Sequence, residues 1–359
     1  MIRKLLYMAA VTLALASCKD EVTLTTLSDT PRLVVYCMPT VGDTTYIGVS
    51  RSIPIKAYND SVKMTVVSDA RISYSVDGRQ LQAEPMGKGF YRVVGRQQAG
   101  DRVSLSVEAD GMAPVSASTV IPDTVAVGNL QVAENIPIYI PDEGQSRRFD
   151  QVMATFTDDP ATRCYYAVRV RVKHYRGSAT GYTDGGHSIY YFYDYADYVQ
   201  KRDQLSLDSA RVEFRDSIYT YPEVNTQSEP LLMPPTEIDD NFGFSNSFYG
   251  NLYIFDDATI NGATYTLHLN VNPSSSASYH DPETGYVYSY DFARAYQVEL
   301  LRITPEYYRF MRSLNELDNN EMARSGLSQI RPMQSNVMGG LGLVGGWNTG
   351  RTGWVLKRS

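Results

Sequence analysis

The amino-acid sequence predicts a mainly β protein: an N-terminal β-sandwich of immunoglobulin-like or transthyretin-like type, followed by a second β-rich domain with one C-terminal helix. Three observations support this fold class. Short apolar runs recur about every eight to twelve residues over 32–120, which is typical of β-sandwiches. Tyrosine, which favours strands, occurs 28 times against 11 phenylalanines and 2 tryptophans. A convincing helical period occurs only after Thr304.

The first predicted domain covers residues 31–122. Residues 32–38 form a nearly continuous apolar run, as a buried strand would, and residues 44–51 alternate between apolar and polar side chains. Asp77-Gly78, between two such runs, is a strong hairpin signal. The Cys…Trp…Cys pattern of antibody domains does not occur, so we expect a different kind of sandwich. Further strands are expected at 63–67, 70–76, 89–94, 102–108 and 114–120.

The second predicted domain covers residues 123–359. After Cys164, the residues alternate strictly, so one face of a strand is apolar and the other is basic. We expect the apolar face to be buried and the basic face, with Arg169, Arg171 and Lys173, to be wet. The apolar positions are Tyr166, Val168, Val170 and Val172. Strands are expected at 150–156, 164–172, 245–255, 261–271, 286–290 and 295–303.

A tyrosine-rich segment covers 165–198, and within it Tyr190-Tyr-Phe-Tyr-Asp-Tyr195 does not sort into buried and exposed positions. We interpret it as an insertion loop, a long edge hairpin or a recognition surface. Tyrosine rings supply contact area at low entropic cost, so they recur in sites that bind sugars and peptides. The alternative is that these rings fill a core or an interface. The candidate ligand-binding or partner-binding residues are Tyr190, Tyr191, Tyr193, Tyr195 and Trp347.

The C-terminal part contains the predicted helix and then a glycine-rich tail. Thr304 is a favoured N-cap residue, Pro305 fits the first helical position and Glu306 places an acid in the first turn. The helix is expected to run for about ten to twenty residues. The tail after Ser335 is too rich in glycine for a helix. Since it also contains Leu, Val and Trp, we expect it to pack back onto a domain. Residues at helical spacing are Tyr307, Tyr308, Met311, Leu314 and Leu317.

Residues 1–17 have the features of a lipoprotein signal peptide. Arg3 and Lys4 form a positive head, an apolar run follows over 5–15, and small residues precede Cys18. The run is too short to span a bilayer. The ending Leu-Ala-Ser-Cys resembles the bacterial lipobox, in which the cysteine is acylated with chains such as palmitate and becomes the first residue of the mature protein. Two or more acyl chains anchor a protein stably.

The residues directly after Cys18 indicate a location. Lys19, Asp20 and Glu21 resemble the acidic export tag of surface lipoproteins of Bacteroidota. The alternative is an ordinary polar tether. We expect residues 18–30 to form a lipidated tether that holds the body at the outer membrane, facing the exterior.

Charge and cysteine content exclude some functions. The formal net charge is −7 at pH 7 and no Lys/Arg run exceeds two residues, so no nucleic-acid partner is expected. Cys37 and Cys164 lie in apolar runs of different predicted domains. Two buried free thiols are therefore favoured over a disulfide.

The sequence contains none of the common catalytic or metal-binding patterns. Its histidines form no zinc pattern, and no nucleophile elbow, P-loop or dinucleotide fingerprint occurs. We therefore predict no catalytic residue, no metal and no cofactor. The histidines are His174, His187, His268 and His280.

Three adjacent acidic pairs need a separate interpretation. Glycoside hydrolysis uses two carboxylates held about 5–9 Å apart, and Asp239–Asn241 offers oxygens of the kind that Ca²⁺ takes. Each pair, however, lies in a turn-like context, so turn formation is the favoured interpretation. The pairs are Asp158-Asp159, Asp239-Asp240 and Asp256-Asp257.

Three stretches together resemble the DUF4249 family of Bacteroidota lipoproteins. One is Leu-Val-Val-Tyr at 33–36, followed by Ile-Gly-Val-Ser-Arg at 47–51. Another is the strand and helix start at 298–310, and the last is the Ser-Asn-Val-Met-Gly-Gly-Leu-Gly segment at 335–342. The resemblance implies a companion of TonB-dependent transporters of the SusC/SusD kind, which import oligosaccharides or peptides. It supplies no catalytic residues.

The sequence and the resemblance lead to one expected function. We expect a non-catalytic outer-membrane lipoprotein, anchored by its N-terminal lipid, that serves as an accessory subunit of a SusC/SusD-like uptake complex for oligopeptides or oligosaccharides. It would contact the transporter proteins, with a peptide or glycan ligand as a further partner. The alternatives are a surface glycan or peptide hydrolase with an unrecognised acidic site, and an adhesin-like surface binding protein.

Overall fold

The computed structural model describes residues 30–53, 65–183, 186–192, 207–232, 249–273, 276–280, 287–291, 294–319 and 333–357. Strands dominate this part of the chain, and α3 (Pro305–Asn319) is the only α-helix within it. The predicted mainly β fold with one C-terminal helix is therefore confirmed. No helix in the described ranges is long and apolar enough to cross a membrane. The predicted signal peptide and residues 18–29 of the tether lie outside these ranges.

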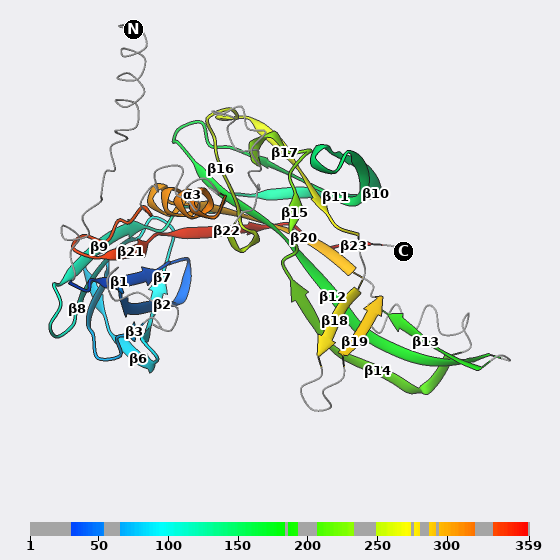
Figure 1. Cartoon of the computed structure of the whole chain (residues 1–359), viewed down its shortest axis with the longest axis horizontal. Coiled ribbons are helices and arrows are strands. Elements are labelled where there is room, and N and C mark those ends of the chain that lie inside the picture. The colour runs from blue at the N-terminus through cyan, green and yellow to red at the C-terminus, as the bar shows by residue number, and fades with distance from the viewer. Residues whose placement is uncertain are drawn as a thin grey trace, which may run out of the picture.

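Two sheets in the N-terminal part face each other across one core and form a β-sandwich (Figure 1). The first contains β1 (Leu33–Cys37), β2 (Gly42–Arg51), β3 (Thr65–Val66), β6 (Ala83–Gly87), β7 (Phe90–Gln97) and β21 (Leu341–Val344), in the order β21-β1-β2-β7-β6 with β3 beside β2. The second contains β4 (Arg71–Val76), β5 (Arg79–Leu81), β8 (Arg102–Glu108) and β9 (Val115–Val120), in the order β5-β4-β8-β9. Strand alternation sends every second side chain into the core.

The predicted hairpin at Asp77-Gly78 is confirmed. Both residues have positive φ, 49° and 81°, as a two-residue turn of this kind requires. The turn pairs Val76 with Arg79 and thereby joins β4 to β5.

In the second half of the chain, a four-stranded and a seven-stranded sheet pack face to face. The strands are β10 (Val127–Ile140), β11 (Gln145–Thr157), β12 (Tyr165–Thr183), β13 (Gly186–Phe192), β14 (Leu207–Thr220), β15 (Val224–Asn225), β16 (Tyr253–Asp256), β17 (Thr264–Val271), β18 (Ser276–His280), β19 (Val287–Asp291), β20 (Arg294–Ile303), β22 (Trp347–Arg351) and β23 (Val355–Lys357). Short 3₁₀ turns occupy Pro141–Glu143, Pro230–Leu232 and Tyr249–Asn251.

The sheet order places β12 and β20 at the centre of this half. One sheet has the order β10-β11-β17-β15, and the other has seven strands with the path β13-β12-β20-β22. Strands β14 and β16 pair with β12, β23 pairs with β20, and β18 and β19 form a separate hairpin. The core between the two large sheets contains the predicted apolar face of β12, and the prediction for that face is confirmed. Those residues are Tyr166, Val168, Val170 and Val172.

Helix α3 covers part of the opposite face of the seven-stranded sheet. Tyr307, Phe310 and Met311 are buried there against residues of β12, β20 and β21. The predicted start is correct, because the carbonyl of Thr304 accepts a hydrogen bond from the Tyr308 amide at 2.9 Å. The hydroxyl of Thr304, by contrast, is buried without a partner in the described part of the chain. Thr304 therefore occupies the N-cap position, but the side-chain cap that its residue type predicts is not formed.

The glycine-rich tail packs back onto the protein, as predicted. β21 runs parallel to β1, with Val35 opposite Gly342, and β22 is antiparallel to β20. The tail therefore passes from the sandwich to the seven-stranded sheet, as the red strands of Figure 1 show. A Cβ atom at Gly342 or Gly350 would collide with the carbonyl of Val35 or Val125. Close backbone approach explains these glycines. The predicted domain limits stay a prediction, although this pairing places 341–344 in the first sheet.

Some strands differ from the expectation. β10 and β14 were not expected, nor were β6 and the strands of the tail. Most side chains of β10 are exposed or half-exposed, so it has no apolar run, and its backbone is held by pairing with β11. The strand expected at 245–255 is limited, within the described residues, to β16. Gly250 and Asn251 before it have left-handed φ values of 65° and 54°, which end the extended conformation.

Candidate functional site

The structure does not describe the side chains of most predicted site residues. Cys18, Lys19, Asp20, Glu21, Tyr193, Tyr195, Asp239 and Asp240 lie outside the described residues. Tyr190 and Tyr191 belong to β13, where their backbones pair with Ala179 and Ser178 of β12. His187 and His280 lie in strands, but their side chains are likewise outside the description.

Trp347 is the predicted binding residue whose side chain can be placed. Its indole Nε1 donates a hydrogen bond to the carbonyl of Met38 at 3.0 Å. Its ring is partly buried and packs with the cluster around α3. These contacts favour the interface-filling alternative for this residue, because the ring joins the tail to the end of β1.

The two predicted thiols are buried, and neither forms a disulfide. Cys37 belongs to the sandwich core and Cys164 to the core between the two larger sheets. The preference for free thiols is therefore confirmed. Burial also raises the pKa of Cys37 to about 12, so its thiol stays protonated at neutral pH.

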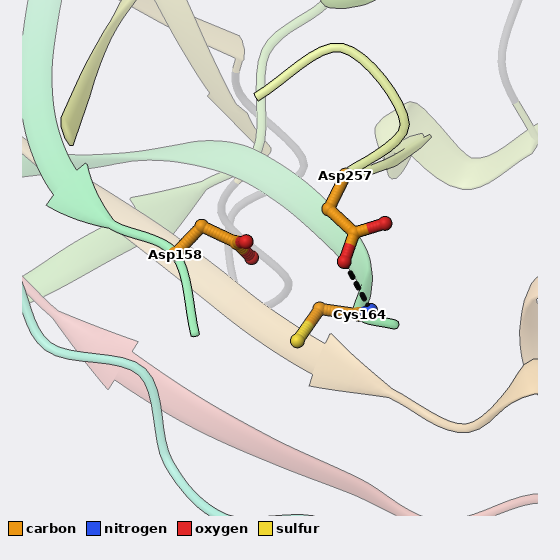
Figure 2. A group of neighbouring side chains, drawn as sticks. All are labelled: Asp158, Cys164 and Asp257. Carbon is orange, nitrogen blue, oxygen red and sulfur yellow. Dashed lines mark hydrogen bonds between the residues drawn. The ribbon is translucent and has the colours of Figure 1, made fainter. Parts of the chain in front are cut away.

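A polar cluster of Asp158, Cys164 and Asp257 lies where β11, β12 and β16 meet (Figure 2). One potential ligand atom from each residue lies within 4.8 Å of the others, and all three residues are buried. For these aspartates turn formation was the favoured interpretation and a hydrolytic carboxylate pair the alternative, and neither interpretation includes this convergence. A usable signal was that Asp158-Asp159 directly follows β11 and Asp256-Asp257 lies at the end of β16, because these two strands flank the start of β12.

Hydrogen bonds inside the protein already engage these carboxylates. Asp158 Oδ1 accepts from the Tyr166 hydroxyl at 2.5 Å, and its Oδ2 accepts from the Gly262 amide at 2.8 Å. Asp257 Oδ2 accepts from the Cys164 amide at 2.6 Å, which is the dashed line in Figure 2. Burial, followed by the bond to Asp158, raises the pKa of Tyr166 above its usual range.

The donor set fits a metal ion poorly. Two carboxylates and a thiolate can bind zinc or a similar cation. However, Arg302 places Nη2 3.1 Å from Cys164 Sγ, where its positive charge would oppose a bound cation. The carboxylate oxygens also accept hydrogen bonds from one hydroxyl and two backbone amides. The cluster therefore stabilises the packing of three strand ends. No chemical step is assigned to it.

The neighbouring aspartates form turns, as predicted. Asp159 Oδ1 accepts from the Ala161 amide at 3.0 Å, and Asp256 Oδ1 accepts from the Ala258 amide at 3.0 Å. The Asp257 carbonyl also accepts from the Ile260 amide at 2.9 Å, so the prediction is confirmed for Asp159, Asp256 and Asp257. Asp158 forms no such turn bond within the described residues and is buried directly after β11.

A second polar group lies on the outer face of the seven-stranded sheet, beyond the part that α3 covers. We call it the arginine–aromatic face. Three adjacent strands contribute one cross-strand row, because Arg169 of β12 lies opposite Glu299 of β20, which lies opposite Arg351 of β22. The face consists of Arg169, Arg171, Arg351, Glu299, Tyr219, Tyr221 and Trp354.

Glu299 organises the charges of this face. Its side chain is 1% exposed. Oε2 accepts from Arg169 Nε at 2.7 Å and Oε1 accepts from Arg351 Nε at 2.8 Å. Arg171 Nη1 lies 4.0 Å from Oε1. Burial by itself raises the pKa of Glu299, but the hydrogen bonds from Arg351 and Arg169 outweigh it and lower the pKa below the usual value.

Aromatic rings stack on the arginines. The guanidinium carbon of Arg169 lies 4.0 Å from the centroid of the Tyr221 ring, and that of Arg171 lies 4.0 Å from the Tyr219 ring. Trp354 adds a third ring, 5.6 Å from Arg171. At these distances the cations are attracted to the ring faces. The basic face of β12, expected to be wet, is thus half-covered: both arginine side chains are 26% exposed.

The arginine–aromatic face is not among the sites predicted from the sequence. The predicted binding tyrosines lie at 190–195, whereas Tyr219 and Tyr221 lie at and after the end of β14, in a segment without an expected strand. The available signal was the spacing of two in Arg169 and Arg171 and again in Tyr219 and Tyr221, which puts each pair on one side of a strand. This spacing does not indicate that Glu299 of β20 and Arg351 of β22 lie beside the arginines of β12.

An open groove of about 590 Å³ lies on the sandwich, beside the start of α3. Serines of β4, β8 and β9 form its floor in cross-strand pairs, for example Ser73 with Ser106 and Ser104 with Ser118. Its rim includes Glu306 and Met338. Neutral hydroxyl groups without an aromatic platform provide less specific ligand chemistry than the arginine–aromatic face.

Comparison with models of known protein families assigns the chain to a family. The chain matches the model of a family described as "Domain of unknown function (DUF4249)" over residues 19–352. The chain belongs to this family. The DUF4249 resemblance inferred from short motifs is confirmed, while the links to Bacteroidota and to SusC/SusD transporters stay predictions. A comparison with curated proteins finds no match.

The DUF4249 motifs that carried the resemblance lie together in space. β1 pairs with β21, and α3 packs against both and against β20. Tyr36 of the first motif contacts Phe310 of the helix, with ring centroids 5.9 Å apart. The motifs that carry the family resemblance therefore meet at the junction between the sandwich and the seven-stranded sheet.

Proposed function

We propose that this DUF4249 protein is a non-catalytic, surface-exposed lipoprotein of the outer membrane and an accessory subunit of a SusC/SusD-like TonB-dependent complex that imports oligopeptides or oligosaccharides. The observation that carries the proposal is the lipobox ending at Cys18, followed directly by Lys19, Asp20 and Glu21. Family membership supports the choice of partner.

A lipid anchor at Cys18 would set the working distance of the protein. Each buried methylene of an acyl chain contributes about 0.8 kcal/mol, so several chains hold the protein firmly. The tether at 18–30 reaches on the order of 40 Å at most when fully extended. The described body would therefore stay close to the membrane, within reach of the extracellular mouth of a barrel.

The use of the acidic groups supports a binding role over a hydrolytic one. Asp158 accepts hydrogen bonds within the protein through both carboxylate oxygens and Asp257 through Oδ2, and Glu299 is held between arginines. A buried carboxylate that is engaged in this way is poorly suited to transfer protons to a substrate. A half-exposed set of rings and cations on a rigid sheet is suited to binding.

Two variants test the proposed location. Cys18→Ala should abolish labelling by radioactive palmitate and release the protein from the membrane fraction. Alanines at Lys19, Asp20 and Glu21 should keep the lipid and the membrane association, but should protect the protein from protease added to intact cells. Membrane retention of the Cys18→Ala protein at the wild-type level would contradict the lipid anchor.

A third test addresses activity and uptake. A deletion strain should grow more slowly on the oligopeptide or oligosaccharide that the complex imports, and a plasmid copy of the gene should restore growth. If the purified protein released free reducing ends or new amino termini from such polymers, the hydrolase alternative would replace the proposal.

A further inference from the structure

We propose that the arginine–aromatic face binds a carboxylate group, so that the ligand is an acidic peptide or an acidic oligosaccharide. The choice between these two sources rests on the proposed function. The carboxylate itself is inferred from the charges, hydrogen bonds and rings of the face.

The face carries more positive than negative charge. Three guanidinium groups surround the single carboxylate of Glu299, and no other described carboxylate lies within 4.0 Å of any of them. Two positive charges therefore have no counter-charge among the described residues, in a chain whose formal net charge is −7. A bound anion would supply the missing charge.

The geometry leaves the arginine forks free. Glu299 accepts hydrogen bonds from the Nε atoms of Arg169 and Arg351. The Nη groups of these two arginines and of Arg171 donate to no acceptor in the described ranges, since Arg171 Nη1 lies 4.0 Å from Glu299 Oε1. Such Nη pairs are suited to a carboxylate, which they bind through two parallel hydrogen bonds. The side chain of Arg351 is 51% exposed, so its fork is reachable from solvent.

Two buried polar atoms beneath the face, one of Gln297 and one of Arg171, have no hydrogen-bond partner in the described part of the chain. Gln297 lies opposite Arg171 in the strand register and is 6% exposed. Its Nε2 donates to the carbonyl of Thr352 at 2.8 Å, but its Oε1 and the Nε of Arg171 are buried without partners in the described part of the chain. Folded proteins retain few such atoms. The Nε of Arg171 is a donor that a carboxylate oxygen can satisfy, whereas the Oε1 of Gln297 is an acceptor and does not itself favour a carboxylate.

The rings give the ligand a second kind of contact. Tyr219 and Tyr221 are 43% and 37% exposed, and Trp354 is half-buried beside Tyr219, with ring centroids 5.9 Å apart. Their stacking on Arg169 and Arg171 holds these arginines in place before a ligand arrives, which lowers the entropy lost on binding. Their open faces can pack on the carbons of a sugar ring or of a peptide side chain.

A direct binding experiment tests this inference on the full lipoprotein in detergent. The probes are tri-galacturonate and N-acetylated tri-glutamate, with maltotriose and N-acetyl-trialanine amide as uncharged counterparts. Titration calorimetry gives the affinity. Trp347→Phe leaves Trp354 as the only tryptophan, so a fluorescence change in that variant reports on the face itself.

The expected result is saturable binding of at least one acidic probe, with a change in Trp354 fluorescence and weaker binding at high salt. Binding of tri-galacturonate alone would identify an acidic sugar, and binding of tri-glutamate alone an acidic peptide. Binding of both would show that the carboxylate dominates recognition. Binding of neither acidic probe, or equal binding of the uncharged counterparts, would overturn the proposal.

Substitutions locate the binding. Arg171→Met should weaken binding about tenfold or more, the loss expected for a charge-assisted hydrogen bond. Tyr219→Ala should weaken binding by about the same factor, because it removes the ring that stacks on Arg171. Arg171→Lys, which keeps the charge but not the fork, should fall between. Arg92→Met is the matched control, since it removes an exposed arginine, paired with Glu84 on the sandwich. Unchanged affinity in the folded Arg171→Lys and Tyr219→Ala proteins would overturn the proposal.

This experiment is independent of the transporter. A protein that binds an acidic probe but associates with no barrel would refute the proposed function and leave this inference intact. A protein that associates with a transporter but binds neither acidic probe would support the proposed function and refute this inference.

Discussion

The Nε atom of Arg351 donates a hydrogen bond to the Oε1 atom of Glu299 at 2.8 Å, and this bond joins the C-terminal tail to a central strand of the largest sheet. The same carboxylate holds Arg169 of β12. One buried acid therefore links three neighbouring strands and also positions the arginines of the proposed binding face.

Replacing Glu299 by Gln should therefore destabilise the protein. The change leaves three arginines without their shared carboxylate, and breaking a buried pair costs about 3 kcal/mol or more in the free energy of unfolding. Urea unfolding followed by circular dichroism measures this quantity. Glu84→Gln, which breaks an exposed pair with Arg92, should change it by about 0.5 kcal/mol or less. Equal effects of the two substitutions would show that Glu299 does not organise the sheet.

The glycine-rich tail offers a test with an internal control. A Cβ atom at Gly346 or Gly350 would collide with the carbonyl of Val120 or Val125, whereas a Cβ atom at Gly353 meets nothing within 4 Å. Gly346→Ala and Gly350→Ala should therefore lower the free energy of unfolding by about 1–3 kcal/mol, the usual cost of overpacking. Gly353→Ala should stay close to the wild type. A tail that tolerated all three substitutions equally would not be packed as described.

The buried thiols predict a simple labelling result. Cys37 and Cys164 are buried and unpaired, and the raised pKa of Cys37 keeps it in the unreactive thiol form. A thiol reagent such as dithionitrobenzoate should modify neither residue in the native protein and both in denaturant. Rapid modification of the native protein, or a band shift on a non-reducing gel, would contradict this arrangement.

His174 predicts a pH dependence of stability. Burial, with the nearby charge of Arg294 as a second cause, lowers its pKa to about 4, whereas an unfolded chain has a value near 6.5. Between these values the unfolded state binds a proton that the folded state does not, so the free energy of unfolding should fall as the pH is lowered from about 6.5. His174→Gln should flatten this slope between pH 6.5 and 5. An unchanged slope in the variant would assign the dependence to other groups.

The sequence predicted strands well where one face is buried. In β12 and β17 the alternation of apolar residues is regular, and their apolar faces are buried as expected, for example at Val168, Val170, Leu267 and Leu269. β10 has no such pattern because most of its side chains face solvent or lie half-exposed. Its backbone is stabilised by hydrogen bonds with β11, and sequence periodicity does not report which strand will supply such a partner.

The sites were harder to predict than the strands, because they depend on residues distant in the chain. Asp158 and Asp257 meet at Cys164 only after β11, β12 and β16 come together. Arg169, Glu299 and Arg351 form a row only in the final register of three strands. The motifs at the two ends of the chain, by contrast, were recognisable because they are continuous in sequence, at 33–36 and at 335–342.

The most direct test of the proposed function is purification of the tagged lipoprotein from native outer membranes in mild detergent, with the recovered proteins identified and quantified by mass spectrometry. An untagged strain is the control for nonspecific recovery. We expect a TonB-dependent barrel protein to be recovered in an amount nearly equal to that of the tagged lipoprotein. Recovery of the lipoprotein alone, from membranes in which such barrels are abundant, would contradict it.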